Sequence, residues 1–153
     1  SFNDYQVGEV IDHIDGNTIC EADHLFATRL WQNNSKVHFD INAREDRKRL
    51  IYGGHIISLV RALSFNGLEN AQLIVGINAG THANPAFAED TIYCWTEVLD
   101  KIDLNVRNIA ALRLRSVGTK EKNQSMKVKS DDGRYLPAIV LDFDYWVLVP
   151  KEL

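Results

Sequence analysis

One segment of the chain sets the expected architecture, residues 53–67 with the sequence GGHIISLVRALSFNG. Its polar residues recur at every third position and would form one narrow stripe on a helix, so the remaining faces of that helix would be apolar. A helix that is apolar nearly all round is typical of the inside of a domain. The pair Asn66-Gly67 supplies a helix stop, since glycine readily adopts the left-handed backbone that ends many helices. We therefore expect a central helix over 55–65, enclosed by other elements, with a polar stripe of His55, Ser58, Arg61 and Ser64.

The segments that follow this helix change to a period of two, which indicates β-strands. Apolar side chains alternate over 72–77, where Leu73, Val75 and Ile77 form one face, and residues 91–99 are rich in β-branched and aromatic side chains. Alternating segments also cover 110–115 and 139–149, and 10–14 is a further candidate strand. One long apolar helix with at least four antiparallel strands predicts an α+β fold in which a sheet curls around the helix.

A shorter helix is predicted before the central one. Thr18 and Glu21 have the spacing of a capping box, in which each side chain bonds the other residue's backbone amide. The helix should fade over 32–35, where Asn and Ser compete for backbone hydrogen bonds. Its apolar residues recur at helical spacing and should form a buried face opposite a polar one. We expect Ala22, Leu25, Phe26 and Leu30 to be buried, and Asp23, His24 and Arg29 to be exposed.

Length and composition are those of an ordinary globular domain. The 153 residues are 45% apolar and 25% charged, with a net charge of −4, so we expect one domain over 1–153 with an exposed polar excursion over 119–134. Without a broad basic field, nucleic acid and anionic membranes are not expected as partners. No segment approaches the roughly 20 apolar residues of a membrane span. Residues 1–9 lack the apolar core of a signal peptide, so a soluble, cytoplasmic protein is expected.

The cysteines bear on metals and redox chemistry. Cys20 and Cys94 are far apart and lack metal-ligand spacing. The sequence therefore predicts no metal site and no disulfide framework, and buried free thiols are expected at both positions.

The polar loop over 32–40 carries the first candidate catalytic group. It ends in His38 beside an aromatic residue, and a neutral imidazole is the usual proton acceptor near neutral pH. Asn33, five residues earlier, could orient a water molecule with its amide. A histidine in such a place also serves in packing or surface hydrogen bonds, so both roles stay open.

The segment Tyr52-Gly53-Gly54-His55 opens the central helix and forms the second candidate. Glycines let a ligand approach the backbone, and free amides at a helix N-terminus can hold a developing oxyanion. A simple tight turn is the alternative. Between the two candidates, a basic cluster could contact phosphates or be a solvated run that neighbouring carboxylates partly neutralise. The cluster comprises Arg44, Arg47, Lys48 and Arg49.

Four parts of the chain, 18–23, 33–39, the glycines before the central helix and 85–91, together resemble the MaoC-like hydratases and dehydratases of the hotdog fold. In that family a loop of the type Gly-Asp-x-Asn-Pro-aliphatic-His precedes the hot-dog helix, and its Asp and His form the catalytic pair. Residues 32–38 occupy those seven places. His38 matches the histidine, whereas Asn33 stands in place of the aspartate. Residues 49–68 and 145–148 are similar to the C-terminal half of a family member that joins two hotdog halves.

The resemblance implies an enoyl-CoA hydratase or 3-hydroxyacyl-CoA dehydratase, which adds water reversibly, in syn geometry, to an α,β-unsaturated CoA thioester. Coenzyme A would enter as part of the substrate, with no other cofactor and no metal, and mesaconyl-CoA is one candidate. His38 would take a proton from water, while Asn33 only positions it, because an amide cannot exchange protons near neutral pH. Binding of the substrate is expected at Tyr52, Gly53, Gly54 and His55, and of CoA phosphates at Arg47 and Arg49.

The missing aspartate leaves the second proton open. His38 could act alternately as base and acid, another group such as His55 or His82 could supply the proton, or the domain could be inactive. His82 also has a simpler interpretation, since Asn84-Pro85 beside it marks a strand end. His13 and His24 are expected to be structural.

Two other functions remain as alternatives. A hotdog thioesterase generally places a carboxylate near the helix, but no Asp or Glu lies between Asp46 and Glu69, which favours the hydratase. A non-catalytic acyl-CoA-binding subunit would account for Asn33 as a mark of lost activity. A single hotdog also leaves a sheet edge uncovered, so a homodimer or higher homo-oligomer with sites near the subunit boundary is expected.

Overall fold

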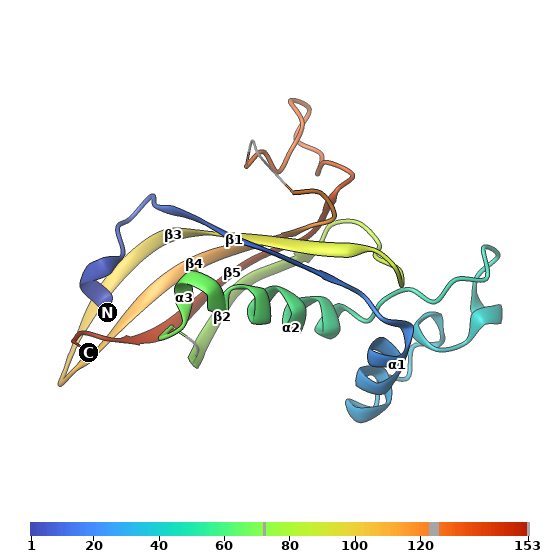
Figure 1. The fold of residues 1–153 in the computed structure, drawn as a ribbon, viewed down its shortest axis with the longest axis horizontal. Helices are drawn as coiled ribbons and strands as arrows, with labels where there is room; N and C mark the ends of the chain where they lie inside the picture. The colour runs from blue at the N-terminus through green and yellow to red at the C-terminus, as the bar shows by residue number, and fades with distance from the viewer. Residues whose placement is uncertain (72, 123–125, 153) are drawn as a thin grey trace.

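The computed structural model describes residues 1–71, 73–122 and 126–152, which form one antiparallel sheet with a helix lying along it (Figure 1). The sheet has five strands in the order β1-β3-β4-β5-β2. The predicted α+β fold is confirmed, with α2 as the central helix. The strands are β1 (Val10–Thr18), β2 (Leu73–His82), β3 (Thr91–Val106), β4 (Ile109–Thr119) and β5 (Ile139–Pro150), and the helices are η1 (Phe2–Asp4), α1 (Glu21–Leu30), η2 (Lys36–His38), η3 (Ile41–Ala43), α2 (Gly53–Leu63) and α3 (Phe65–Leu68).

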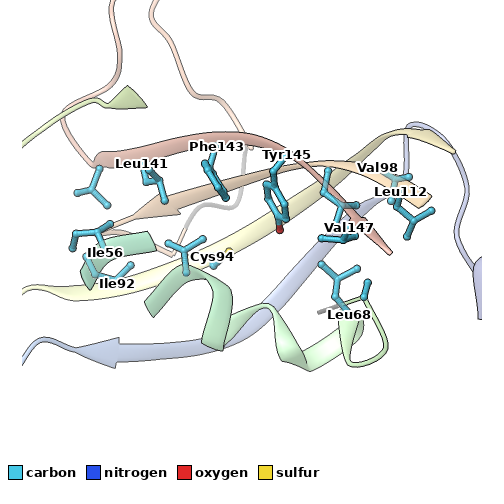
Figure 2. Close-up of a cluster of buried hydrophobic side chains, with 14 of the residues drawn as sticks. Ile56, Leu68, Ile92, Cys94, Val98, Leu112, Leu141, Phe143, Tyr145 and Val147 are labelled. Atoms are coloured by element: carbon cyan, nitrogen blue, oxygen red, sulfur yellow. The ribbon is translucent and has the colours of Figure 1, made fainter. Parts of the chain in front are cut away.

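The helix α2 matches the predicted central helix but starts at the glycine pair rather than at His55. Its Ile56 and Val60 are buried in the cluster that also holds Phe143 and Tyr145 of β5 (Figure 2). Gly67 follows with a φ of 102°, the left-handed conformation expected of the helix stop. A Cβ at Gly67 would also lie 2.8 Å from Cγ2 of Ile11, so this turn requires glycine.

The polar stripe of α2 is divided between solvent and core. Ser58 is exposed, but Ser64 is buried and Arg61 is half-buried. Arg61 donates to the hydroxyl of Tyr145 at 2.8 Å. Because buried polar groups need partners, this contact extends into a network across the sheet that includes Ser116, Thr96 and the buried His13.

The start of α1 differs from the prediction. Cys20 is its N-cap and makes no side-chain cap hydrogen bond, so the predicted capping box between Thr18 and Glu21 is wrong. Thr18 instead ends β1, where its hydroxyl lies 2.8 Å from that of Thr91 on the paired strand. Sheet pairing thus occupies the side chain that would have capped the helix.

The faces of α1 also differ from the prediction. Phe26 and Leu30 were expected to be buried and are 68% and 59% exposed, and Ala22 is exposed as well. His24 and Thr28 are the buried residues of this helix. Long-range hydrogen bonds of His24 therefore set the orientation of α1, and its apolar face is left on the surface.

The strand β2 lies at one edge of the sheet, beside β5. Its predicted apolar face points away from the core, since Leu73, Val75 and Ile77 are 62%, 54% and 63% exposed. Gln72, on the other face of the predicted strand, lies outside the described residues. An exposed apolar row on an edge strand is a candidate contact surface for another chain or domain.

The sheet face opposite α2 carries paired charges. Arg113 binds both carboxylate oxygens of Asp144, and Arg115 binds both of Asp142, at 2.6 to 3.0 Å. These residues belong to neighbouring strands β4 and β5. The predicted alternation of charged and apolar residues on both strands is confirmed by this arrangement.

The excursion predicted over 119–134 projects beyond the sheet at the end of β4 (Figure 1). Its residues 123–125 lie outside the described part of the chain. Val128 within it is buried in a small cluster with Trp95 of β3 and Ile139 of β5. The excursion thus contributes a second, smaller apolar cluster on the sheet.

The two cysteines differ in their surroundings. Cys94 is buried as predicted, and burial raises the pKa of its thiol to about 12. Cys20 is exposed, so the prediction of a buried thiol is wrong there. None of the helices in the described ranges is long and apolar enough to span a membrane.

Candidate active site

A cavity of about 380 Å³ opens where the N-terminus of α2 meets the end of β2. Gly53 lines it from α2, His38 from η2 and His82 from the last position of β2. Among the described residues that line the cavity, His38 and His82 are the titratable ones, and none carries a carboxylate. The fold therefore brings together three segments that the sequence indicated separately.

His38 is held by its backbone surroundings in one tautomer. Its Nδ1 lies 2.8 Å from the carbonyl oxygen of Leu50 and must donate to it, because a carbonyl can only accept. The lone pair is then on Nε2. The amide of Leu50 in turn donates to the carbonyl of Val37 at 2.9 Å. His38 is thus oriented as a potential proton acceptor at the cavity.

His24 connects this histidine to the start of α2. Its Nε2 donates to the carbonyl of His38 at 2.8 Å, and its Nδ1 accepts from the amide of Tyr52 at 3.2 Å. Burial lowers the pKa of His24, which keeps it neutral, as these two bonds require. His24 thus has the structural role expected of it, although its predicted exposure is wrong.

The glycine pair supplies two free donors. Among the residues that the structure describes, neither the amide of Gly53 nor that of Gly54 has a hydrogen-bond partner. The helix dipole adds to their positive potential. A side chain at either position would require a neighbouring ring to move: a Cβ at Gly53 would lie 2.6 Å from Nε2 of His82, and one at Gly54 would lie 2.6 Å from the ring of Tyr52. Glycine therefore lets both rings pack directly against the start of α2.

The other predicted site residues lie around the cavity rather than in its lining. The Oδ1 of Asn33 accepts from the amide of Ser35 at 2.9 Å in a local turn. The ring of Tyr52 lies edge-on to His38, with centroids 5.9 Å apart. His55 faces His24 with centroids 6.4 Å apart, and burial lowers its pKa while Asp23 opposes this shift.

The two arginines predicted to contact phosphates differ in how far other groups of this chain already bind them. Arg49 is engaged, since it pairs with Glu21 at 2.7 Å and donates to the carbonyl of Phe39. Arg47 is exposed and donates to the side chain of Asn42 at 3.2 Å. Within the same cluster, Arg44 and Lys48 both lie over the ring of Phe87, 5.5 and 5.6 Å from its centroid.

Two contributors to the site were absent from the sequence prediction, namely the carbonyl of Leu50 and the linking role of His24. Neither has a local signal, because each acts on a partner 12 to 28 residues away. A backbone carbonyl in particular leaves no mark in residue types.

The curled sheet around one central helix, with a histidine-lined cavity at the N-terminus of that helix, defines a hotdog-fold domain. The comparisons with known proteins give a more specific relationship. The chain is 58% identical over 150 residues to mesaconyl-CoA hydratase of Cereibacter sphaeroides. The matched region covers 98% of this chain and 44% of that relative. It is 54% identical over 156 residues to beta-methylmalyl-CoA dehydratase of Chloroflexus aurantiacus, covering 99% and 44%. No family model matches the chain.

A solved structure extends this relationship to the coordinates. A MaoC domain protein dehydratase from Chloroflexus aurantiacus superposes with a TM-score of 0.94 at 51% identity, over 99% of this chain and 45% of that one. The predicted resemblance to the MaoC-like hotdog proteins is thereby confirmed. The chain spans about half the length of these relatives. Its correspondence to the C-terminal half stays a prediction.

Proposed function

We propose that this domain is an enoyl-CoA hydratase or 3-hydroxyacyl-CoA dehydratase, a hydro-lyase that adds water reversibly to an α,β-unsaturated CoA thioester. One observation carries the proposal. His38, whose Nδ1 donates to the carbonyl of Leu50, and Gly53, whose amide is free among the described residues, line one cavity, and Gly54 follows Gly53 in α2. A base and an oxyanion site in one place are what hydration of an enoyl thioester requires.

The chemistry follows from these groups. The thioester oxygen would accept hydrogen bonds from the free amides of Gly53 and Gly54. His38 would take a proton from water as the water oxygen bonds to C3, and electron density would move onto the thioester oxygen. Amides aimed at that oxygen stabilise the enolate more than the substrate, which lowers the barrier. The protonated His38 would then return the proton to C2 on the same face.

Asn33 enters this proposal as a neutral group. Its Oδ1 is engaged with Ser35, which leaves its NH₂ group to position water. Because an amide carries no proton in either direction, His38 would be both base and acid. We propose no cofactor or metal beyond the coenzyme A of the substrate.

The acyl group and the CoA contacts belong to the same proposal. The names of the relatives, mesaconyl-CoA hydratase and beta-methylmalyl-CoA dehydratase, support mesaconyl-CoA as the substrate. The half-buried His55 at the start of α2 suits a carboxylated acyl chain. Tyr52 would border the thioester site, and Arg47 and Arg49 would contact CoA phosphates, Arg47 being the less engaged. A cytoplasmic location would accord with a CoA thioester substrate.

The alternatives receive unequal support. A thioesterase usually needs a carboxylate to activate water, and no carboxylate lines the cavity among the described residues. The second candidate is a non-catalytic acyl-CoA-binding domain. One observation favours it, namely that Asn33 replaces the expected acid and lies outside the described cavity lining.

Turnover of thioesters tests the proposal directly. We expect saturable loss of the conjugated enoyl absorbance with crotonyl-CoA and mesaconyl-CoA, and no reaction with saturated butyryl-CoA. The measurement is a spectrophotometric assay with the product identified by chromatography. Tight binding of both enoyl thioesters without turnover would instead support the acyl-CoA-binding candidate.

We further propose that a second hotdog covers the exposed row Leu73, Val75 and Ile77 on β2. When residues 1–153 are produced as a separate protein, a second copy of this chain would supply that hotdog. The double variant Val75→Lys/Ile77→Lys is then expected to weaken self-association at least about tenfold, because each lysine would bring an unpaired charge into an apolar contact. Native mass spectrometry and sedimentation over a concentration series measure this.

The matched control places two lysines on the opposite edge strand, where Asp15 and Asn17 of β1 are exposed with the same spacing. The variant Asp15→Lys/Asn17→Lys should associate like the parent. Equal association in all three proteins would show that the β2 row is not the contact.

A further inference from the structure

His82 is the second titratable group among the described residues that line the cavity, and its ring packs against Gly53, one of the proposed oxyanion donors. A Cβ built on Gly53 would lie 2.6 Å from Nε2 of His82, 2.8 Å from Cε1 and 3.1 Å from Cδ2. The imidazole therefore packs against the backbone of Gly53 with its Nε2 edge. Within the part of the chain that the structure describes, the His82 side chain makes no hydrogen bond and no ion pair.

The surroundings of His82 favour the neutral imidazole. Its contact with Gly53 places it beside the first residue of α2, where the helix dipole disfavours a cation. Although the residue is exposed overall, partial removal of the ring from water lowers its pKa. A neutral imidazole is a poor proton donor but a good hydrogen-bond donor through the nitrogen that keeps its hydrogen.

We propose that His82 is a catalytic residue that donates an Nε2–H hydrogen bond to the thioester oxygen, as a third member of the oxyanion site beside the amides of Gly53 and Gly54. This inference rests on the proposed function and deepens it. No proton leaves His82 in the reaction, so the water proton taken by His38 is the one returned to C2, and the charges balance. Neutral imidazoles polarise carbonyl groups in this way in other active sites.

The roles of hydrogen-bond donor and proton carrier are separated by two variants. His82→Ala removes the donor and is expected to lower kcat about 10²- to 10³-fold with little change in KM, because the bond strengthens in the transition state. His82→Gln keeps an N–H at the place of Nε2 but cannot transfer a proton, and we expect it to retain kcat within about tenfold of the parent. The pH profile of His82→Gln should match that of the parent.

A binding measurement keeps the test independent of turnover. Butyryl-CoA with a ¹³C-labelled thioester carbonyl serves as a non-reacting probe, and isotope-edited infrared spectroscopy reads its carbonyl stretch. We expect a shift to lower frequency on binding to the parent protein and to His82→Gln, and a smaller shift on binding to His82→Ala. Circular dichroism melts establish that each variant is folded.

The outcomes distinguish this inference from the proposed function. A smaller carbonyl shift in His82→Ala, and not in His82→Gln, supports the hydrogen bond even if no enoyl-CoA is hydrated. Equal carbonyl shifts in the parent and His82→Ala, or parent-like kcat in His82→Ala, would overturn it. A His82→Gln protein as slow as His82→Ala, with an altered pH profile, would also overturn it, since His82 would then be a proton carrier.

Discussion

Replacement of His38 by alanine is expected to abolish hydration of crotonyl-CoA and mesaconyl-CoA, with a fall in kcat of about 10³- to 10⁴-fold. The size of the effect follows from the cavity lining. Asn33 cannot carry a proton, and His82 is proposed to donate a hydrogen bond without exchanging its proton, so His38 would be the only proton carrier among the described residues of the cavity lining. Steady-state assays on the folded variant measure the loss.

Asn33→Ala provides the comparison. Because Asn33 is proposed only to position water, this variant should keep partial activity, well above that of His38→Ala. The hydrogen bond of His38 to Leu50 uses Nδ1, so His38→Asn, which can keep that bond but lacks a base, should be as inactive as His38→Ala. Parent rates in both the His38→Ala and Asn33→Ala proteins would refute the assignment of this loop.

Replacement of Gly53 by alanine is expected to lower kcat about 10²-fold without unfolding the domain. The new methyl carbon would lie 2.6 Å from Nε2 of His82, so the imidazole must move from its place on the helix N-terminus. The ring is exposed at one side and can move without disturbing the core. Alanine also has a higher helix propensity than glycine, so thermal stability should be retained. Assays of kcat and a thermal melt on the same sample give both quantities.

A double-mutant cycle identifies the cause of this loss. If Gly53→Ala acts by displacing His82, then it should cost little further activity once the ring is absent in His82→Ala. The double variant should therefore resemble His82→Ala alone. Fully additive losses in kcat would show that Gly53 acts independently of His82.

The sequence predicted which segments form helices and strands better than it predicted which faces of those helices and strands are buried. The period of two over 139–149 and the apolar run of α2 determine the strand and the helix, because both patterns reflect burial along a single element. The faces of α1 were wrong because His24 is buried by bonds to His38 and Tyr52, which helical periodicity does not contain. Similarly, Thr18 pairs with β3 rather than capping α1.

For the candidate site, too, the sequence indicated single residues but not how they come together. His38 and the glycine pair were indicated by residue type and by the resemblance to the MaoC-like proteins. Their meeting with His82 depends on where β2 ends relative to α2, which is a property of the sheet register and not of local sequence. The sequence alone therefore left His55 and His82 as equal candidates for a second group, whereas the structure places His82 in the cavity lining.

The exposed apolar residues of β2 and α1 accord with the length of the relatives. Leu73, Val75 and Ile77 lie on a sheet edge, and Phe26 and Trp31 are 68% and 67% exposed on and beside α1. The matched relatives are about twice as long as this chain. The proposed second hotdog would cover such surfaces.

Product analysis in D₂O shows whether the His38 cavity adds water to an enoyl-CoA. The protein is incubated with mesaconyl-CoA or crotonyl-CoA, and the products are examined by mass spectrometry and NMR. We predict a 3-hydroxyacyl-CoA with an intact thioester and one deuterium at C2, formed by the parent protein and not by His38→Ala. Release of free coenzyme A, or unchanged substrate with the folded parent protein, would contradict hydration by this cavity.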